Sequence, residues 1–224
     1  MPSNASATSA GPCRLCTFEA TALAYSIAGT QVDRCQRCGF FQVRSPPTSS
    51  EIAAIYSEKY FDHQKYEGNW SSKRETNRRL ALLSKAGVRD GSRVLDAGCA
   101  TGDFILSATS KYEMWGLDVS PQAIAKARER LPDLAQRLIA APLEQHGLLE
   151  DHFDAIALWD VVEHLWDPVS TLSKLLPLLR PGGAIVLSTP NIGSLSAKLQ
   201  GRRWAFMTPP EHLVFFARNT MHQL

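Results

Sequence analysis

The sequence predicts a doubly wound α/β fold with a mainly parallel, Rossmann-like sheet, preceded by a small cysteine-rich segment. Two observations lead to this expectation. Short apolar runs alternate with helical patterns over residues 91–224, which is typical of parallel strands joined by crossover helices. The first part of the chain instead carries two C-x-x-C pairs, a pattern typical of a small unit built around a metal.

Each expected strand is a short run rich in apolar residues. The strands are expected at 93–97, 113–118, 137–141, 154–159 and 184–189. The helices are expected at 51–57, 73–86, 103–110, 120–130, from Asp160, at 170–179, at 194–200 and from near Asn219. Ser120 should cap its helix and Pro121 should open it, whereas Pro181-Gly-Gly183 should break the chain before the fifth strand.

The chain is expected to have four parts. They are a disordered tail at 1–11, a four-cysteine ribbon at 12–44, a linker with a helical, aromatic-rich lid segment at 45–90, and the α/β domain at 91–224. The aromatic-rich segment carries Tyr60, His63 and Tyr66. These rings would either close over a bound ligand or dock the ribbon onto the main domain.

The composition excludes some classes of function. The chain has 224 residues, of which 44% are hydrophobic and 21% are charged, and its formal net charge is +2. A near-neutral charge gives no electrostatic footprint for nucleic acid. No apolar run reaches membrane-spanning length, and the first residues lack the apolar core of a signal peptide. We therefore expect a cytoplasmic protein that binds neither nucleic acid nor a membrane.

The four N-terminal cysteines, Cys13, Cys16, Cys35 and Cys38, follow the pattern C-x2-C-x18-C-x2-C. This spacing predicts a tetrahedral four-cysteine zinc site. Four thiolates leave no open coordination position, so the zinc should be structural and should supply folding free energy that so short a segment lacks. Two disulfides or a redox pair are the alternatives, and a cytoplasmic setting disfavours both.

The stretch Val94-Leu-Asp-Ala-Gly-Cys-Ala-Thr-Gly102 joins the first expected strand to its helix. Asp96, Gly98 and Gly102 follow the spacing D-x-G-x-x-x-G. Glycine permits positive φ and lets a ligand approach the backbone, and the helix start behind the turn offers free N–H groups. Asp118 ends the next expected strand, where a carboxylate can accept hydrogen bonds from ribose hydroxyls. These features predict a nucleotide-like ligand at the carboxyl end of the sheet.

Motifs in this part of the chain resemble those of class I S-adenosylmethionine (SAM)-dependent methyltransferases, and they stand in the family's order. They are Val94–Gly102, Gly116–Val119, Phe153–Pro168, Leu179–Asn191 and Glu211–Phe216. The resemblance implies a SAM site and methyl transfer. The alternatives are a NAD site or a sheet without a ligand. The dinucleotide fingerprint G-x-G-x-x-G fits poorly, because Gly98 is followed by Ala100 and then Gly102.

The resemblance also implies which residues bind the cofactor. Residues in and after the glycine turn would contact the methionine and ribose parts of SAM: Asp96, Gly98, Cys99, Ala100, Gly102 and Phe104. Asp118 would hold the ribose hydroxyls, with Val119 against adenine. Residues after the third and fourth strands would contact adenine and face the methyl donor, respectively: Ala141, Pro142 and Leu143, then Trp159 and Asp160. Cys99 would be a small turn residue rather than a nucleophile.

Asp160, Glu163 and His164 form a first candidate group for the acceptor side, because positions i, i+3 and i+4 share one face of a helix. They resemble the acid-and-histidine cluster that binds a divalent cation in ubiquinone-pathway O-methyltransferases, where the first position is usually Glu. The alternative is that Asp160 caps the helix and the Glu-His pair lines a pocket without a metal.

Glu211 and His212 form a second candidate group. They resemble the Glu-His region of C-methyltransferases in antibiotic deoxysugar pathways, where the histidine acts as a base. Those enzymes also begin with a four-cysteine zinc domain and a tyrosine-rich segment. The candidate catalytic residues are therefore His212, Glu211 and His164. The alternative is that His212 packs or forms a hydrogen bond beneath a loop.

The leading hypothesis is a SAM-dependent methyltransferase that acts on a small molecule, such as a sugar or a specialised metabolite, at oxygen or carbon. A second hypothesis is an RNA or protein methyltransferase whose ribbon presents Arg14, Arg34, Arg37 and Arg44 on one face. A third is a non-catalytic SAM-fold subunit, because five strands are expected where the family usually has seven. The bare edge of the fifth strand would then be covered by a partner chain or a second copy.

Overall fold

The computed structural model describes residues 11–48, 50–52 and 70–224. The described residues form two compact units. The first unit contains the chain up to Thr48 together with Glu163–Val169 and Pro190–Leu224. The second unit contains the described parts of Ser49–Val162 and Ser170–Thr189. Each unit has its own sheet.

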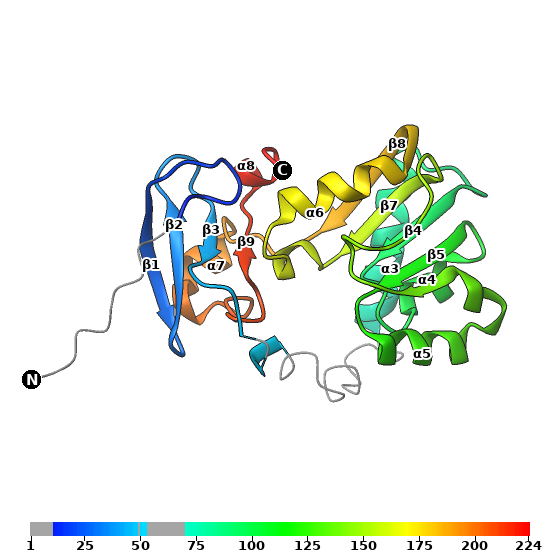
Figure 1. The fold of residues 1–224 in the computed structure, drawn as a ribbon, viewed down its shortest axis with the longest axis horizontal. Helices are drawn as coiled ribbons and strands as arrows, with labels where there is room; N and C mark the ends of the chain where they lie inside the picture. Colours follow the sequence, from blue (N-terminus) through cyan, green and yellow to red (C-terminus); the bar gives the residue numbers. More distant parts are fainter. Residues whose placement is uncertain (1–10, 49, 53–69) are drawn as a thin grey trace, which may run out of the picture. The chain divides into compact units, whose positions relative to one another are not determined.

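The second unit is built on a five-stranded sheet in the order β6-β5-β4-β7-β8, in which every neighbouring pair is parallel (Figure 1). The strands are β4 (Arg93–Ala97), β5 (Glu113–Asp118), β6 (Leu138–Ala140), β7 (Phe153–Trp159) and β8 (Leu179–Ser188). The strand order reverses between β4 and β7, as the doubly wound prediction requires. The predicted α/β class and its parallel sheet are confirmed.

Helices alternate with these strands. They are α3 (Trp70–Lys85), α4 (Asp103–Ala108), α5 (Pro121–Arg130), η1 (Pro132–Arg137), α6 (Pro168–Leu175) and η3 (Leu176–Leu178). The side chain of Ser120 caps α5 by accepting a hydrogen bond from the amide of Ala123, as predicted. Val94 packs with residues of α3, α4 and α5 in one core cluster, and its neighbour Leu95, which points to the opposite face, is also fully buried. Both faces of the sheet are therefore covered, as a parallel sheet requires.

The fifth strand differs from its predicted bounds. Pro181-Gly-Gly183 was expected before the strand, but β8 already pairs with β7 at Leu179. The register then shifts, because Phe153 pairs with Leu179 whereas Ala155 pairs with Ala184. Pro181 lacks a backbone N–H for the ladder, so the residues around it form a bulge within the strand. Among the described strands, β8 is an edge strand of this sheet, as predicted.

The first unit contains a four-stranded antiparallel sheet in the order β1-β2-β3-β9. The strands are β1 (Thr21–Ile27), β2 (Thr30–Cys35), β3 (Phe41–Val43) and β9 (Val214–Phe215). The cysteine-rich segment therefore shares its sheet with a strand from the C-terminal segment. The C-terminal segment also supplies α7 (Leu195–Gln200), η4 (Gly201–Arg203) and α8 (Arg218–Met221). Buried side chains from both segments form one core: Val32, Val43, Ala197, Trp204, Met207, Leu213 and Phe215.

Several predictions fall outside the described residues. Residues 50–52 are helical, but the rest of the helix expected at 51–57 is not described. Tyr60, His63 and Tyr66 of the expected lid segment also lie outside the described residues, as does most of the expected tail. Among the described helices, none combines the length and the apolar character needed to cross a membrane.

Candidate functional site

The glycine turn connects β4 to α4 through residues with positive φ: Gly98 (87°), Ala100 (46°) and Gly102 (80°). The amides of Gly98 and Cys99 donate to the carbonyl of Leu117, at 2.7 and 3.1 Å. These bonds tie the start of the turn to β5. The D-x-G-x-x-x-G stretch is thus a compact strand–turn–helix corner at the carboxyl edge of the sheet.

The carboxylate of Asp118 braces this turn. Its Oδ2 accepts from the amide of Ala100 at 2.9 Å, and its Oδ1 accepts from the amide of Ser120 at 2.8 Å. Burial raises the pKa of Asp118, and the two amide donors oppose that shift. The carbonyl of Asp118 also accepts from the amide of Ala141 at 3.0 Å. Asp118 therefore forms hydrogen bonds with both the turn after β4 and the segment after β6, so these two segments lie next to each other.

Gly98 is required by packing as well as by φ. A Cβ at this position would lie 2.5 Å from Cγ2 of Val161, a distance that atoms cannot adopt. The segment after β7 therefore lies directly against the glycine turn. Its neighbour Cys99 is buried, and burial raises the pKa of its thiol well above its usual range. A thiol with such a pKa is a poor nucleophile, which agrees with a packing role for Cys99.

Three buried polar atoms at the carboxyl ends of strands have no hydrogen-bond partner among the described residues: Oδ1 of Asp96, Nε1 of Trp159 and Oγ1 of Thr189. Burial raises the pKa of Asp96 to about 7; Arg79 opposes the shift and Asp118 adds to it. An unsatisfied buried carboxylate favours a cationic or hydrogen-donating ligand beside it. Phe104 packs edge-on against Trp159, with ring centroids 5.2 Å apart. Among the other expected contacts, Val119 and Pro142 are exposed.

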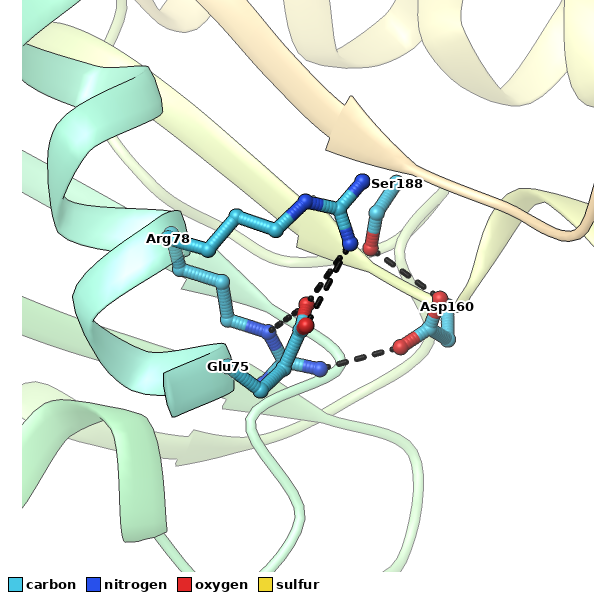
Figure 2. A network of polar contacts seen from close by, with 5 residues as sticks. Glu75, Arg78, Asp160 and Ser188 are labelled. Carbon is cyan, nitrogen blue, oxygen red and sulfur yellow. Dashed lines mark hydrogen bonds and ion pairs between the residues drawn. The ribbon is translucent and has the colours of Figure 1, made fainter. Parts of the chain in front are cut away.

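Asp160 belongs to a polar network that the sequence did not reveal (Figure 2). Its Oδ2 pairs with Nη2 of Arg79 on α3 at 2.9 Å, and its Oδ1 accepts from Oγ of Ser188 at 3.0 Å. Glu75 pairs with Arg79 at 3.5 Å and with Arg78 at 3.3 Å. The guanidinium of Arg79 also lies over the ring of Trp159, 5.4 Å from its centroid.

This network corrects the expected helical face of Asp160, Glu163 and His164. The helix is only a short 3-10 turn, η2 (Val162–His164). Asp160 lies outside it with a φ of 57°, which is not a helical value. Its carboxylate is held by Arg79 and Ser188, so it does not act as a helix cap. Glu163 and His164 instead have His212 as their neighbour.

Glu163, His164 and His212 form the histidine cluster of the first unit. Each offers one potential ligand atom, and these atoms all lie within 4.8 Å of one another. Glu163 and His212 are buried, with 2% and 8% of their surfaces exposed. The two imidazole rings lie 4.8 Å apart at an angle of 78°. The carbonyl of Glu163 accepts from the amide of Leu213 at 2.7 Å, which joins the two segments of the cluster.

Main-chain carbonyls determine the tautomers of both histidines. Nδ1 of His164 lies 2.9 Å from the carbonyl of Glu211, and Nδ1 of His212 lies 2.8 Å from the carbonyl of Phe206. A carbonyl only accepts hydrogen bonds, so each Nδ1 carries the proton and each neutral ring keeps a lone pair on Nε2. A ring held in this way can accept a proton or bind a cation. Glu211 contributes its main-chain carbonyl to the cluster.

The four cysteines of the ribbon lie together as predicted. Sγ of Cys13 is 3.7 Å from Sγ of Cys38, Sγ of Cys16 is 3.7 Å from Sγ of Cys35, and all four sulfurs lie within 4.8 Å of one another. A zinc ion about 2.3 Å from each sulfur would set the sulfurs about 3.8 Å apart. None of the four forms a disulfide. The geometry fits a four-thiolate zinc ion.

Two of the four arginines proposed for RNA binding are used inside the first unit. The guanidinium of Arg14 stacks on the ring of Trp166, 3.7 Å from its centroid, and donates to the carbonyls of Val43 and Leu213. Burial lowers the pKa of Arg14 to about 10. Arg44 donates two hydrogen bonds to the buried carboxylate of Asp33, at 2.9 and 2.6 Å. Arg14 and Arg44 are therefore held by contacts inside the first unit.

The chain is similar to known proteins in sequence and in fold. A family model described as a methyltransferase domain matches residues 63–224. A ubiquinone biosynthesis O-methyltransferase of Aromatoleum aromaticum is 35% identical over 119 residues, which cover 50% of each chain. A probable S-adenosylmethionine-dependent methyltransferase of Mycolicibacterium smegmatis is 35% identical over 104 residues, which cover 45% of this chain and 39% of that one. The chain thus spans about half the length, or less, of these relatives.

The fold is shared with solved structures. A putative sarcosine dimethylglycine methyltransferase from Galdieria sulphuraria matches with a TM-score of 0.50 and 19% identity, over 58% of this chain and 52% of that one. At this identity the likeness concerns the fold alone. It agrees with the doubly wound sheet of the second unit.

Proposed function

The chain belongs to the SAM-dependent methyltransferase family, and from this premise we propose that it transfers a methyl group from SAM to a small-molecule acceptor. The observation that carries the proposal is the braced corner after β4, where Asp118 holds the amide of Ala100 and Asp96 keeps an unsatisfied buried oxygen. The whole activity, including the acceptor, is our proposal, with a sugar or a specialised metabolite as the expected class.

The residues at the carboxyl edge of the second unit fit SAM. Asp96 supports a cationic ligand, because a nearby positive charge would stabilise a carboxylate that burial otherwise protonates. The carboxylate of Asp118 accepts hydrogen bonds from two main-chain amides. Its oxygens have further lone pairs that can accept hydrogen bonds from the ribose hydroxyls. Val119 and Pro142 are exposed, so both are accessible to adenine. SAM, when bound, supplies a methyl group that its sulfonium already activates.

The histidine cluster supports proton removal from the acceptor. His212 is our candidate general base, because the carbonyl of Phe206 holds its Nδ1–H and leaves Nε2 as the basic atom. His164 has the same arrangement with the carbonyl of Glu211. A base of this kind suits an acceptor with an acidic O–H or C–H group. Glu163 would stabilise an imidazolium that forms beside it.

A divalent cation is the second candidate use of this cluster. Two imidazoles and one carboxylate within 4.8 Å of one another form a donor set that suits zinc and other first-row metals. This set includes His212 where the sequence had suggested Asp160. A bound cation would position an oxygen acceptor and lower its pKa.

Calorimetry with SAM and S-adenosylhomocysteine tests the proposal on the zinc-loaded 224-residue chain. Asp118→Ala should abolish micromolar binding, because it removes the brace of the turn and the ribose acceptor. Asp133→Ala, an exposed acid on η1, is the matched control and should bind normally. A folded wild-type chain that binds neither compound would overturn the proposal.

Methyl transfer is then measured with labelled SAM and a panel of small acceptors. Labelling of RNA or protein instead, with a shift of labelled RNA at low salt, would favour the macromolecular alternative. SAM binding without transfer to any acceptor, together with a partner chain bound along β8, would favour the non-catalytic subunit.

A further inference from the structure

The first unit contains a cavity of about 690 Å³ that none of the steps above uses. The cavity lies among β1, the loop and strand around Phe41, α7 and the turn before α8. Its volume falls in the range of small-molecule sites, which is about 300–1,000 Å³. All its lining residues belong to the first unit, so the cavity lies within that unit.

Apart from the zinc-site cysteine Cys38, the charged side chains that line this cavity are cations. Arg34, Lys198 and Arg218 line it together with His222, and the lining contains no Asp or Glu. Unlike Arg44, the three cations have no carboxylate partner among the residues that the structure describes. Cations that line a concave surface without carboxylate partners attract an anion.

The guanidinium of Arg34 has neighbours on two sides. It lies over the ring of Phe41, 5.4 Å from the centroid. On another side it approaches Gly39, where a Cβ would lie 3.4 Å from Nη2 and where φ is +79°. A larger residue at position 39 would thus be strained by the positive φ, and its Cβ would be in van der Waals contact with the guanidinium. An arginine positioned in advance loses less entropy when it binds a phosphate through two parallel N–H bonds.

The walls of the cavity are aromatic and apolar. Tyr25 stacks on Phe41 with ring centroids 5.9 Å apart and an angle of 20° between the rings. Trp204 and Met207, both buried, form another part of the lining. These surfaces suit a flat ring, and the volume is far larger than an inorganic anion needs.

We propose that this cavity binds a phosphorylated small molecule, with its phosphate at Arg34, Lys198 and Arg218 and its ring against Tyr25 and Phe41. Phosphate is favoured over a carboxylate because three cations match a doubly charged anion. The site goes beyond the proposed methyl transfer, since it uses neither the glycine turn nor the histidine cluster.

Calorimetry with the zinc-loaded full chain tests the site with three probes: phenyl phosphate, inorganic phosphate and benzyl alcohol. Phenyl phosphate should bind more tightly than inorganic phosphate, and benzyl alcohol should not bind measurably. Arg34→Gln should weaken the binding of phenyl phosphate about ten- to a hundredfold, because it removes a charged hydrogen-bond donor. Lys198→Gln and Arg218→Gln should each weaken it too.

Arg202→Gln is the matched control, because Arg202 is an exposed cation on η4 that does not line the cavity. It should change the affinity by less than about twofold. Equal losses in Arg34→Gln and Arg202→Gln would show a diffuse charge effect and overturn the site. No binding of phenyl phosphate at millimolar concentration would also overturn it, as would tighter, salt-sensitive binding of single-stranded RNA that phenyl phosphate does not displace.

Zinc content and the thermal unfolding midpoint establish that each variant is folded. SAM affinity measured on the same variants separates the two proposals. Loss of phenyl phosphate binding with unchanged SAM affinity concerns this cavity alone, whereas failure of SAM binding in the wild type leaves the cavity result standing.

Discussion

His164 and His212 lie with ring centroids 4.8 Å apart, and each donates its Nδ1–H to a main-chain carbonyl. The carbonyl for His164 belongs to Glu211, the residue before His212. His164 is therefore positioned by the segment of His212, whereas His212 is held by Phe206 of its own segment. The ring of Phe206 also lies parallel to that of His212, with centroids 6.5 Å apart. A change in the segment from Phe206 to His212 should therefore alter both rings.

Replacement of His212 by alanine should reduce methyl transfer about 10²- to 10⁴-fold, the usual contribution of a general base. SAM affinity should stay within about twofold, because the glycine turn is untouched. Turnover with labelled SAM and calorimetry on the same preparation measure both quantities. His146→Ala, in the second unit, is the control. Turnover that survives in His212→Ala would remove His212 from the mechanism.

Asp96 should make stability depend on pH. Burial holds its pKa at about 7 in the folded chain, against an ordinary value of 3.8, so only the unfolded chain releases this proton between about pH 4 and pH 7. The stability that this group contributes is therefore fullest below about pH 4 and is lost as pH rises to about 7. Asp96→Asn should gain stability over the wild type across that window, by up to about 4 kcal/mol for a shift of about three pKa units.

Urea unfolding of the SAM-free chain at several pH values between 4.5 and 8 measures this effect. Asp133→Asn, at an exposed acid, should show no such trend. A stability difference between Asp96→Asn and the wild type that stays constant with pH would contradict the raised pKa.

Removal of zinc should loosen the C-terminal strand as well as the ribbon. β9 pairs with β3, and β3 follows the second cysteine pair, so loss of the four-thiolate site should expose the amides of Val214 and Phe215. Hydrogen exchange with and without a chelator measures this. Cys35→Ser should reproduce it and lower the bound zinc from one equivalent, while Cys99→Ala should keep the full equivalent. Unchanged protection at β9 after zinc removal would contradict the coupling.

The contact between Gly98 and Val161 should be measurable by a double-mutant cycle. Gly98→Ala introduces a Cβ 2.5 Å from Val161 and a residue at a φ of +87°. We expect a loss of about 2–4 kcal/mol in the free energy of unfolding, from strain and overpacking together. Gly91→Ala has a similar φ of +82° but open space around its Cβ, so it should lose only the strain part, about 1 kcal/mol.

Val161→Ala combined with Gly98→Ala should recover part of the loss, because the smaller side chain makes room. Chemical denaturation of the four chains gives the coupling energy. Additive losses would indicate that the two residues do not meet.

The strands of the second unit follow from local pattern. β4 and β5 have the predicted bounds, and β6 and β7 lie within about one residue of theirs, because each is a short apolar run with a turn signal after it. β8 was predicted less well, since a Pro-Gly-Gly signal cannot by itself distinguish a loop from a bulge inside a strand. The four-cysteine cluster was predicted from spacing alone, because metal-ligand geometry restricts that spacing.

The relationships that the sequence did not reveal are long-range. Nothing in the pattern around Arg79 indicates that it reaches Asp160, because the pairing depends on how α3 packs. The pairing of β3 with β9 joins two very short strands, and neither carries a clear alternation. The tautomers of His164 and His212 are set by main-chain carbonyls, and no side-chain motif encodes these partners. The helical face expected for Asp160 failed because one residue with positive φ ended the helical geometry.

The pairing of β3 with β9 also sets an order of events during synthesis on the ribosome. The cysteines precede the second unit in the chain, so they leave the exit tunnel first and would capture a zinc ion while the second unit is still being translated. Phe41 can pair only after Phe215 has been translated, so the edge of the nascent hairpin stays open while the whole second unit is made. An exposed strand edge is where chains associate wrongly, which makes the long interval between these two residues the stage at which a chaperone would matter most.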